Sequence, residues 1–458
     1  MNMERDPVVE AILDLARSVT YKRLGDVERH GASRMLLDSL GCALGAIHEP
    51  VPRIARDVAT SGMVTGACGL IGDRRRSDAD LAAFANGVAI RYFDLNDSYA
   101  SPHGVGHPSD YIAAVLAAAE ESGEGGRAVI EGMAVAYELF GALTDALQLG
   151  VEGWDHVLAG SIASAVAAGM VFGLADDDLR NCVSLSMVPN FPLQATRLGE
   201  LSMWKGCAAG NASRSGVFAA RLARAGLSGP PLPFVGRGGF QAVLGIEVDL
   251  EALRPGRRPP AIGNSNVKRY PSGYFSQGAI DAAVEVRARL DGDVAAITAV
   301  EIGTFPYGAT VMAGDPEKWH PATRESADHS LPYVVATALV HGDLGLQRFE
   351  PEALSDPEVA GVLGVLEVHV DPECAGAWPA SVMTKLAVTT ASGRREEARV
   401  RFYRGHAQNP MSDQEIETKA ADLAAGALTP SAFARLAERV WLLPELTSVG
   451  DLLSLTWP

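Results

Sequence analysis

Apolar residues recur at the three- and four-residue spacing of amphipathic helices through the first half of the chain. This spacing predicts two helices between Pro7 and about Gly45. Further helices are predicted at residues 78–93, 110–122, 127–149, 158–174, 176–186 and 203–226. The segment Ile162–Leu174 is short and rich in alanine and glycine, which predicts a buried core helix and not a membrane span. The last helix of this series is expected to stop at Gly226, shortly before Gly229-Pro-Pro.

The period of the pattern changes after Arg254-Pro-Gly-Arg-Arg-Pro-Pro, which is the best linker candidate in the chain. Val300–Phe305, Leu366–Val370 and Leu386–Thr390 alternate apolar and polar residues, which predicts half-buried strands. Ala391-Ser-Gly-Arg is expected to join the third strand to Glu397–Phe402 as a hairpin. Helices are also predicted in this half of the chain, at residues 278–290, 329–341, 412–425 and 430–441.

These elements predict a mainly α protein with an inserted α/β (α+β) domain. A chain of 458 residues is longer than a single core usually supports, so more than one domain is expected. We expect a large helical domain built from residues 1–263 and 405–458, at the two ends of the chain. A smaller α/β lid domain is expected at residues 264–404.

Composition limits the classes of partner. Apolar residues make up 47% of the chain and charged residues 21%, which is typical of a soluble globular protein. The net charge of −17 argues against nucleic acid or an anionic membrane as a partner. An anionic small molecule would need a locally cationic pocket, which draws attention to the few lysines. They are Lys22, Lys205, Lys268, Lys318, Lys385 and Lys419.

The cysteines argue against two kinds of metal site. The five cysteines are scattered without a CxxC pair, although zinc ribbons and iron–sulfur clusters need clustered thiolates. Their odd number and wide spacing favour free thiols in a reducing cytoplasm. The N-terminus lacks a basic region followed by an apolar run, so no signal peptide is expected and the predicted location is cytoplasmic.

Several common catalytic motifs are missing from the sequence. It contains no phosphate-binding loop, no dinucleotide fingerprint, no His-Glu-x-x-His and no Gly-x-Ser-x-Gly elbow. The sequence therefore argues against a nucleotide-dependent enzyme, a zinc hydrolase and a serine hydrolase.

Residues 84–110 contain the densest group of candidate catalytic residues. Asp94, Asp97 and Ser98 have the i, i+3, i+4 spacing that would place them on one face of a helical turn. A loop rich in glycine and proline then presents His107, and Pro108 prevents that residue from continuing into a helix. Carboxylate, hydroxyl and imidazole groups together can transfer protons. The alternative is a capped helix followed by ordinary surface polar residues.

Two further candidates lie at predicted helix starts. His156 precedes the helix that begins near Leu158, where an imidazole tends to stay neutral and can act as a base. The alternative is an ordinary histidine at a helix boundary whose hydrogen bonds are satisfied. Lys205 lies in the first turn of a helix among apolar residues, where a cation needs an anion. That anion is either a protein carboxylate or a substrate.

Two more candidate groups lie in the second half of the chain. Lys268 and Arg269 are adjacent cations at the predicted domain junction, where ligand clefts are common. They could also be a solvated pair of charges in a linker. Asp328 and His329 belong to a polar segment that either caps the next helix, through Asp328 or Ser330, or faces a substrate.

In their order along the chain, these segments resemble the motifs of the MmgE/PrpD family, most of all its 2-methylcitrate dehydratase branch. The matching segments are Asp94-Leu-Asn-Asp-Ser-Tyr, Gly106-His-Pro-Ser-Asp, Trp154-Asp-His-Val-Leu, Trp204-Lys-Gly-Cys-Ala-Ala-Gly-Asn-Ala, Lys268-Arg-Tyr-Pro, Ala327-Asp-His-Ser-Leu-Pro-Tyr and Gly405-His-Ala-Gln-Asn-Pro. They span almost the whole chain, and as an ordered set they are specific.

The resemblance implies a helical domain with an inserted α/β lid, a homodimer, and an active site between the domains. Family members act on citrate-like polycarboxylates as dehydratases, cis-aconitate decarboxylases or an iminodisuccinate epimerase, and none is thought to need a metal or an organic cofactor. The resemblance places six residues in the site: Asp94, Ser98, His107, His156, Lys205 and Lys268.

The sequence departs from the family pattern at two positions. Members of the dehydratase branch usually carry a histidine just before the Ser-Gln pair, where this chain has Phe275. Ser98 stands where threonine is common. Phe275 therefore bears on the identity of the substrate and on one proton-transfer step.

The leading hypothesis is a cofactor-independent hydro-lyase that acts on a 2-methylcitrate-like polycarboxylate. Its reaction removes a proton next to a carboxylate, and nearby cations would stabilise the resulting charge. We expect the residues that bind the substrate to be Lys205, Lys268, Arg269, Asp328 and His329. His107 and His156 are the candidate acid and base, with Asp94 orienting or charging one of them, and the assignment between the two stays open.

Other readings remain open as well. The same pocket could support decarboxylation or epimerisation, because all three reactions stabilise a carbanion beside a carboxylate. A non-catalytic polycarboxylate-binding protein and a purely structural helical scaffold are alternatives of a different class.

Overall fold

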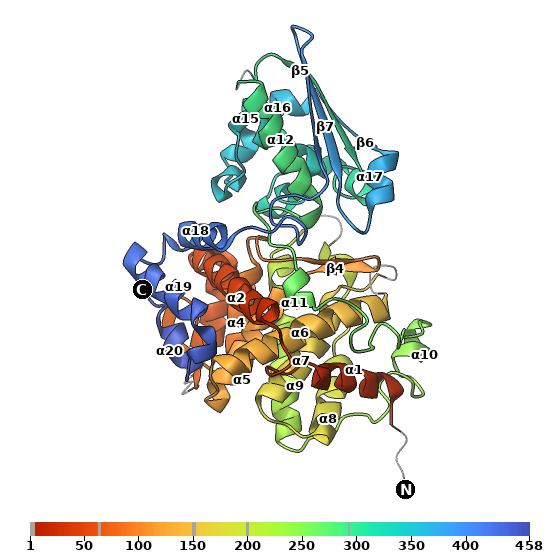
Figure 1. Ribbon diagram of the computed structural model, residues 1–458, viewed down its shortest axis with the longest axis vertical. Helices are drawn as coiled ribbons and strands as arrows, with labels where there is room; N and C mark the ends of the chain where they lie inside the picture. The colour runs from red at the N-terminus through yellow and green to blue at the C-terminus, as the bar shows by residue number, and fades with distance from the viewer. Residues whose placement is uncertain (1–4, 63–65, 149–152, 198–200, 292–293) are drawn as a thin grey trace. The chain divides into compact units, whose positions relative to one another are not determined.

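Helices make up most of this protein, as the computed structural model in Figure 1 shows. The structure describes residues 5–62, 66–148, 153–197, 201–291 and 294–458. The protein is mainly α with a smaller amount of β structure, which confirms the predicted fold class. Contacts within the chain divide it into two compact units. The first is built from Met1–Gly199, Met203–Ser265 and Ser412–Pro458, and the second from Glu200–Ser202 and Asn266–Met411.

The first unit is almost entirely helical. Its long helices are α1 (Pro7–Ser18), α2 (Asp26–Ala46), α3 (Pro50–Ala59), α4 (Ala79–Arg91), α5 (Ile112–Ser122), α6 (Gly126–Leu147), α7 (Val157–Val171), α8 (Asp176–Met187), α9 (Trp204–Arg224), α18 (Asp413–Ala424) and α19 (Pro430–Trp441). Its short helices are α10 (Phe240–Leu244), α11 (Ala261–Asn264) and α20 (Val449–Ser454). Two small hairpins complete it: β1 (Cys68–Leu70) with β2 (Asp73–Ser77), and β3 (Tyr99–Ser101) with β4 (Gly104–Gly106).

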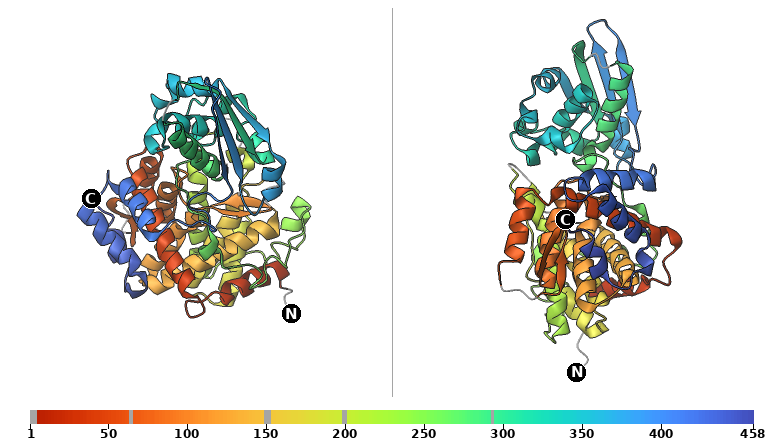
Figure 2. Two further views of the ribbon diagram at one scale, coloured as in Figure 1. Left: turned by 45° about the horizontal axis from the view of Figure 1, so that its top comes forward. Right: turned by 90° about the vertical axis from the view of Figure 1, so that its left-hand side faces the viewer.

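The C-terminal helices belong to the same unit as the N-terminal ones. Helices α18 and α19 both pack on α2, and the views in Figure 2 show them side by side. The contact includes a buried ion pair in which Lys419 Nζ lies 2.6 Å from Asp38 Oδ1. The same ammonium donates to the Leu95 carbonyl at 2.8 Å, so the C-terminal part of the chain also holds the loop that follows α4.

Small residues bring α4 and α9 into direct backbone contact. A Cβ added to Gly87 would lie 2.9 Å from the Cα of Gly210, and one added to Gly210 would lie 2.7 Å from the Phe84 carbonyl oxygen. Glycine is required at this crossing because a larger side chain would push the two helices apart. The crossing places the C-terminal end of α4 next to the first turn of α9, where Gly206 lies against Tyr92.

The second unit is built around a four-stranded sheet. The strands are β5 (Ile297–Thr304), β6 (Leu366–Val370), β7 (Thr384–Thr390) and β8 (Arg395–Val400), in the order β6-β5-β7-β8. Only the β5–β6 pair is parallel, with Val300 opposite Leu366. Strands β7 and β8 form the predicted hairpin, with Leu386 opposite Ala398.

Helices cover this sheet and supply its core. α12 (Gln277–Arg289) packs against β7 and β8, and α15 (Leu331–His341) packs against α12 (Figure 1). Their buried residues form one apolar cluster with Val300, Ile302 and Val388 of the sheet. The shorter helices of this unit are α13 (Pro306–Thr310), α14 (Arg324–Ala327), α16 (Pro357–Leu363) and α17 (Pro372–Ala377).

The helical turn predicted across Asp94, Asp97 and Ser98 is wrong. Helix α4 ends at Arg91, and Asp94 adopts a left-handed backbone conformation with φ of 52°, which an α-helix does not accommodate. Aspartate is one of the few residues that enters this conformation readily, because its short side chain can hydrogen-bond locally. The three residues therefore lie on an irregular loop that leads into strand β3.

Other local predictions are confirmed or were missed. Ser330 caps α15, where its hydroxyl accepts from the Tyr333 amide, whereas helix α3 and the two small hairpins were not predicted. Within the described part of the chain, no helix combines the length and the apolar character that crossing a bilayer requires.

Candidate active site

The loop after α4 brings a buried arginine to the candidate carboxylate. Arg91 is the last residue of α4, and its Nη1 donates to Asp94 Oδ1 at 2.5 Å. Both side chains are buried, at 3% and 2% exposed. The left-handed turn at Asp94 makes this contact possible, because it returns the carboxylate toward the helix that has just ended. A buried arginine so close holds the carboxylate in one orientation.

His107 is held through both ring nitrogens. Its Nδ1 lies 2.6 Å from the backbone oxygen of Asp97. A carbonyl oxygen can only accept, so Nδ1 carries the proton. Nε2 then accepts from Arg91 Nη2 at 3.1 Å. The Ser98 hydroxyl lies 3.3 Å from Nδ1, so this candidate is also part of the group.

Lys205 reaches the same carboxylate from α9. It lies in the first turn of the helix, and its Nζ is 3.8 Å from Asp94 Oδ2. The sequence left two possible anions for this lysine, and the structure shows a protein carboxylate. Asp94 thus lies between two cations, Arg91 and Lys205. The close approach of α4 and α9 at Gly87 and Gly210 produces this arrangement.

His156 precedes the first turn of α7 and forms a pair with its neighbour in the sequence. Its Nδ1 lies 2.9 Å from Asp155 Oδ1, and the Arg197 guanidinium lies 3.0 Å from the other oxygen of that carboxylate. A backbone bridge between Trp154 and Leu193 joins the two segments that carry these groups. Burial tends to raise the pKa of Asp155, but Arg197 and His156 outweigh it and hold that pKa well below its usual range.

The second ring nitrogen of His156, Nε2, is the candidate base of the Asp155–His156 pair. Asp155 is ionised and can only accept, so Nδ1 of the neutral ring donates and the lone pair lies on Nε2. Nε2 is buried and has no hydrogen-bond partner within the described residues. Burial lowers the pKa of His156, and Asp155 only partly opposes it. The ring is therefore neutral at neutral pH.

The two histidine rings lie edge to face with 5.7 Å between their centres. Phe140 of α6 packs on the His156 ring, and Gly106 of β4 lies directly against the rings of Phe140 and His156. A Cβ added at Gly106 would lie 2.3 Å from Phe140 Cζ and 2.9 Å from His156 Cδ2. Position 106 must therefore be glycine for His156 to hold its orientation.

A buried polar layer lies behind His107. Asp97 and Asp110 are both fully buried, and the amide of Asn96 donates to Asp110 Oδ1 at 2.8 Å. The Ser109 amide donates to Asp97 Oδ1 at 3.1 Å. Burial raises the pKa of Asp97 to about 6 and that of Asp110 to about 7.

The candidates of the second unit lie on one well-held loop and one helix end. Gln277 accepts from the Arg269 and Tyr270 amides at 3.2 and 3.1 Å and fixes the segment that carries Lys268. Lys268 is buried, whereas the Arg269 side chain is 52% exposed and lies 4.0 Å from Asp281. The structure thus gives Arg269 a protein carboxylate as a neighbour.

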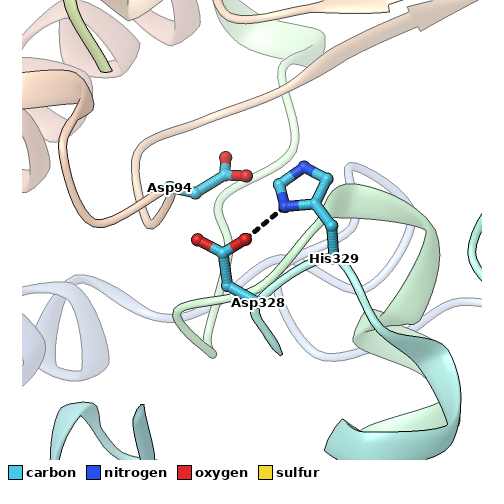
Figure 3. A group of neighbouring side chains, drawn as sticks. All are labelled: Asp94, Asp328 and His329. Atoms are coloured by element: carbon cyan, nitrogen blue, oxygen red, sulfur yellow. Dashed lines mark hydrogen bonds and ion pairs between the residues drawn. The ribbon is translucent and has the colours of Figure 1, made fainter. Parts of the chain in front are cut away.

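Asp328 and His329 are hydrogen-bonded to each other, with His329 Nδ1 against Asp328 Oδ1 (Figure 3). The same loop that carries Lys268 holds them, because Ser272 Oγ and the Gly273 amide both donate to the Asp328 backbone oxygen, at 2.8 and 2.9 Å. A carboxylate and an imidazole are suitable metal donors.

Phe275 lies in a cluster of aromatic side chains. Its ring centre is 4.7 Å from that of Tyr307, 5.2 Å from Phe305 and 5.7 Å from Trp378. A phenyl ring neither donates nor accepts a proton, so position 275 takes no part in proton transfer in this chain. The residue contributes packing instead.

Within the first unit, the structure brings the sequence-predicted residues together. Asp94, Ser98 and Lys205 each lie within 4 Å of another candidate or of Arg91, and His107 stacks edge to face on His156. The sequence did not single out Arg91, Asp155, Arg197 or Asp110. Asp155 had a local signal, since an acid directly before a candidate histidine can orient its ring. Arg91 had none, because a basic residue at a helix C-terminus is common.

Comparison with known proteins gives one consistent result. Residues 10–252 match the model of the MmgE/PrpD N-terminal domain, and residues 270–443 match that of the MmgE/PrpD C-terminal domain. A 2-methylcitrate dehydratase of Cupriavidus necator is 28% identical over 423 residues, which cover 87% of this chain and 86% of that protein. One from Salmonella typhimurium is 28% identical over 384 residues, covering 79% and 77%. A 2-methylcitrate dehydratase-like protein of Aspergillus oryzae is 28% identical over 447 residues, covering 91% and 88%.

Proposed function

The chain belongs to the MmgE/PrpD family, and we propose that it is a cofactor-independent hydro-lyase that dehydrates 2-methylcitrate or a similar citrate-like polycarboxylate. Relatives named 2-methylcitrate dehydratase, which align over most of the chain, support the reaction class. The chemistry of the first unit supports it independently.

One observation carries the proposal. His156 is a neutral histidine whose Nδ1 is bonded to a carboxylate and whose Nε2 has no partner within the described residues. This is the arrangement of a general base, because the carboxylate stabilises the imidazolium that forms when Nε2 takes a proton. Lys205 and Arg91 lie nearby around Asp94, and cations of this kind can stabilise charge on a carboxylate substrate.

The proposed reaction breaks one C–H bond and one C–O bond and forms one C=C bond. His156 Nε2 removes the proton from the carbon next to a substrate carboxylate. The electron pair of that C–H bond becomes the new double bond, and the hydroxyl on the adjacent carbon leaves. The proton that His156 has taken passes to this hydroxyl, which leaves as water, while His107, with Ser98 beside it and Arg91 on its Nε2, keeps a fixed orientation next to these groups.

The family resemblance implies that residues of the second unit also bind the substrate. We assign the substrate carboxylates to Lys205, Lys268 and Arg269, and we include Asp328 and His329 among the residues that bind the substrate. Arg269 is half exposed and lies 4.0 Å from the Asp281 carboxylate, so it can turn toward a ligand at little cost. The Asp328–His329 pair can donate from the imidazole to a substrate oxygen.

Two further parts of the proposal concern assembly and location. We propose a homodimer, which the family resemblance implies, and a place in propionate metabolism in the cytoplasm. The five cysteines are free thiols, four of them buried, which favours a reducing compartment. Light scattering on the purified protein would measure the mass, and a monomer at working concentration would contradict the first part.

The proposal is tested by absorbance near the enoate band. Purified protein is mixed with 2-methylcitrate, citrate or cis-aconitate in separate assays, each with and without a chelator. A rise with 2-methylcitrate that persists with the chelator is expected. No rise with any of the three would overturn the assignment, and a rise that the chelator abolishes would overturn cofactor independence.

Phe275 favours a second candidate. Because it replaces a histidine usual in the dehydratase branch and packs among aromatic rings, one proton-transfer step of that branch could be missing here. The protein would then be a decarboxylase or an epimerase of the same family, or a member that binds polycarboxylates without turnover. Released CO2 or a change in optical rotation identifies the first two. Calorimetric binding of citrate without product identifies the third.

A further inference from the structure

Arg91 contacts two candidate catalytic residues, Asp94 and His107, and also the buried carboxylate of Asp110. Its Nη1 contacts Asp94 and its Nη2 contacts His107, while its Nε faces Asp110 Oδ2 at 3.8 Å. The guanidinium is planar and its donors have fixed directions. The position of one edge against Asp110 therefore sets the directions of the two N–H groups that reach Asp94 and His107.

Asp110 is itself held rigidly. It lies in a 3-10 turn, Pro108–Tyr111, and Asn96 fixes its Oδ1 at 2.8 Å. The Asp110 amide donates to the His107 carbonyl at 3.0 Å, and the Ser213 hydroxyl of α9 donates to the Asp110 carbonyl at 2.9 Å. The second carboxylate oxygen, Oδ2, is buried without a hydrogen bond among the described residues and faces Arg91. Nothing in the proposed chemistry uses this carboxylate directly.

From this geometry we propose that Asp110 is a positioning residue, whose ionised carboxylate fixes Arg91 so that Asp94 and His107 are held in their working orientation. Adding a proton to Asp110 removes the charge that attracts Arg91 Nε and loosens that orientation. The inference rests on the proposed dehydration only for the expected pH dependence of kcat. The contact itself is a property of the first unit alone.

Several charged and titratable groups around Asp110 affect its proton. They are Arg91 at the end of α4, Asp97 on the following loop, Arg197 from the turn Gln194–Arg197, Tyr111 beside it, Tyr137 of α6, and the Asp38–Lys419 pair beyond Asp97. Burial raises the pKa of Asp110 to about 7; Arg91 opposes this and Asp97 adds to it. The carboxyl therefore changes its charge close to neutral pH.

The first test is the pH dependence of kcat in the wild type and two variants. We expect wild-type kcat to fall as the pH drops through about 7. Asp110→Asn should lose about 10²-fold at pH 8, as a misplaced catalytic group does, and should lose this step in the profile. Asp97→Asn is the matched control: Asp97 is equally buried, and its carboxylate accepts from the Ser109 amide at 3.1 Å. Because Asp97 raises the pKa of Asp110, this variant should keep the step and move it to lower pH.

The second test needs no turnover. Nitrogen NMR of protein labelled with 15N-histidine follows the His107 Nε2 signal, assigned by its loss in His107→Gln. In the wild type this signal should change between pH 6 and 8, as the hydrogen bond from Arg91 weakens. In Asp110→Asn it should not. If Asp110→Asn does not fold, the wild-type signal and the shifted step of Asp97→Asn still decide the matter.

The results separate this inference from the proposed function. A wild-type protein that dehydrates nothing, yet shows the His107 change, overturns the function and supports the coupling of Asp110 to His107. A His107 signal that is constant between pH 6 and 8, or an Asp110→Asn profile that keeps the step, overturns the inference. A purely structural role for Asp110 would lower the unfolding temperature without moving either readout.

Discussion

His107 and His156 each have one arginine and one carboxylate nearby, but the group that touches the ring differs between them. At His156 a carboxylate, Asp155, touches the ring, and an arginine, Arg197, touches the carboxylate. At His107 an arginine, Arg91, touches the ring, and a carboxylate, Asp94, touches the arginine. The rings themselves are 5.7 Å apart, so the two settings differ through their neighbours and not through their position in the fold.

The order of the charges decides what each ring can do. A carboxylate on Nδ1 favours a proton on Nε2, because it stabilises the imidazolium. An arginine on Nε2 occupies the lone pair and repels a second positive charge. His156 is therefore suited to taking a proton, and His107 is suited to holding a fixed orientation between Ser98 and Arg91. This difference supplies the assignment that the spacing of the residues left open.

The largest effect is expected from removing the His156 imidazole. His156→Gln keeps a polar side chain of similar size but removes the base, so kcat for 2-methylcitrate should fall by about 10²–10⁴-fold. The measurement is steady-state turnover by the enoate absorbance.

The matched control uses another histidine–aspartate pair of the same chain. His341 Nε2 lies 2.9 Å from Asp356 Oδ2 at the end of α15 and belongs to no proposed site. His341→Gln should leave kcat within about twofold, as a surface change does. Unchanged turnover in His156→Gln would remove His156 from the mechanism and end the comparison of the two rings.

A smaller effect is expected from Asp155→Asn. In this variant the amide oxygen of Asn can still accept from Nδ1, but the charge that stabilises the imidazolium is removed. We therefore expect kcat to fall about 10–10²-fold. Asp155 partly opposes the lowering of the His156 pKa, so its removal lowers that pKa further. Any acid limb that His156 causes lies below its ordinary pKa of about 6.5 and should move to still lower pH. A limb that moves to higher pH would contradict the pairing.

The sequence predicts the elements that carry these groups better than it predicts the groups themselves. Helices such as α4, α7 and α9 were predicted to within a few residues because their apolar period is local. The first-turn position of Lys205 and the place of His156 just before α7 followed from it. The strands β5 to β8 were predicted for the same reason.

The contacts between elements could not be predicted in this way. Asp155 and Arg197 are 42 residues apart in the sequence, and backbone contacts such as the bridge between Trp154 and Leu193 bring their segments together. The contact of Arg91 with Asp94 depends on a left-handed residue, where the spacing suggested a helical turn. Family resemblance brought Asp94, His107 and His156 forward together. It did not provide their hydrogen bonds, which distinguish the two histidines.

Gly106 offers a way to disturb His156 without touching either charge. A Cβ at this position would meet Phe140 and the His156 ring at less than 3 Å, so Gly106→Ala should force a shift of the ring. Overpacking of this kind costs about 1–3 kcal/mol in unfolding free energy. Urea unfolding would measure the loss. Turnover should fall with it, and a variant with lowered stability but full activity would show that the orientation of His156 is unimportant.

The smallest effect on stability is expected at Phe275, which lies in the other unit and serves as a contrast to both histidines. Phe275→His removes one ring from a cluster with Phe305, Tyr307 and Trp378, and aromatic pairs contribute about 0.5–1.5 kcal/mol beyond their buried area. Thermal unfolding should report a loss of that order.

Kinetics then decide what the substitution means. If His156 suffices for proton transfer, Phe275→His leaves the choice of substrate unchanged and lowers kcat only with stability. If turnover of 2-methylcitrate instead rises above that of the wild type, position 275 contributes a further proton-transfer group in the relatives. The contrast between His107 and His156 would then describe only part of the chemistry, and the wild-type chain would be one whose substrate has changed.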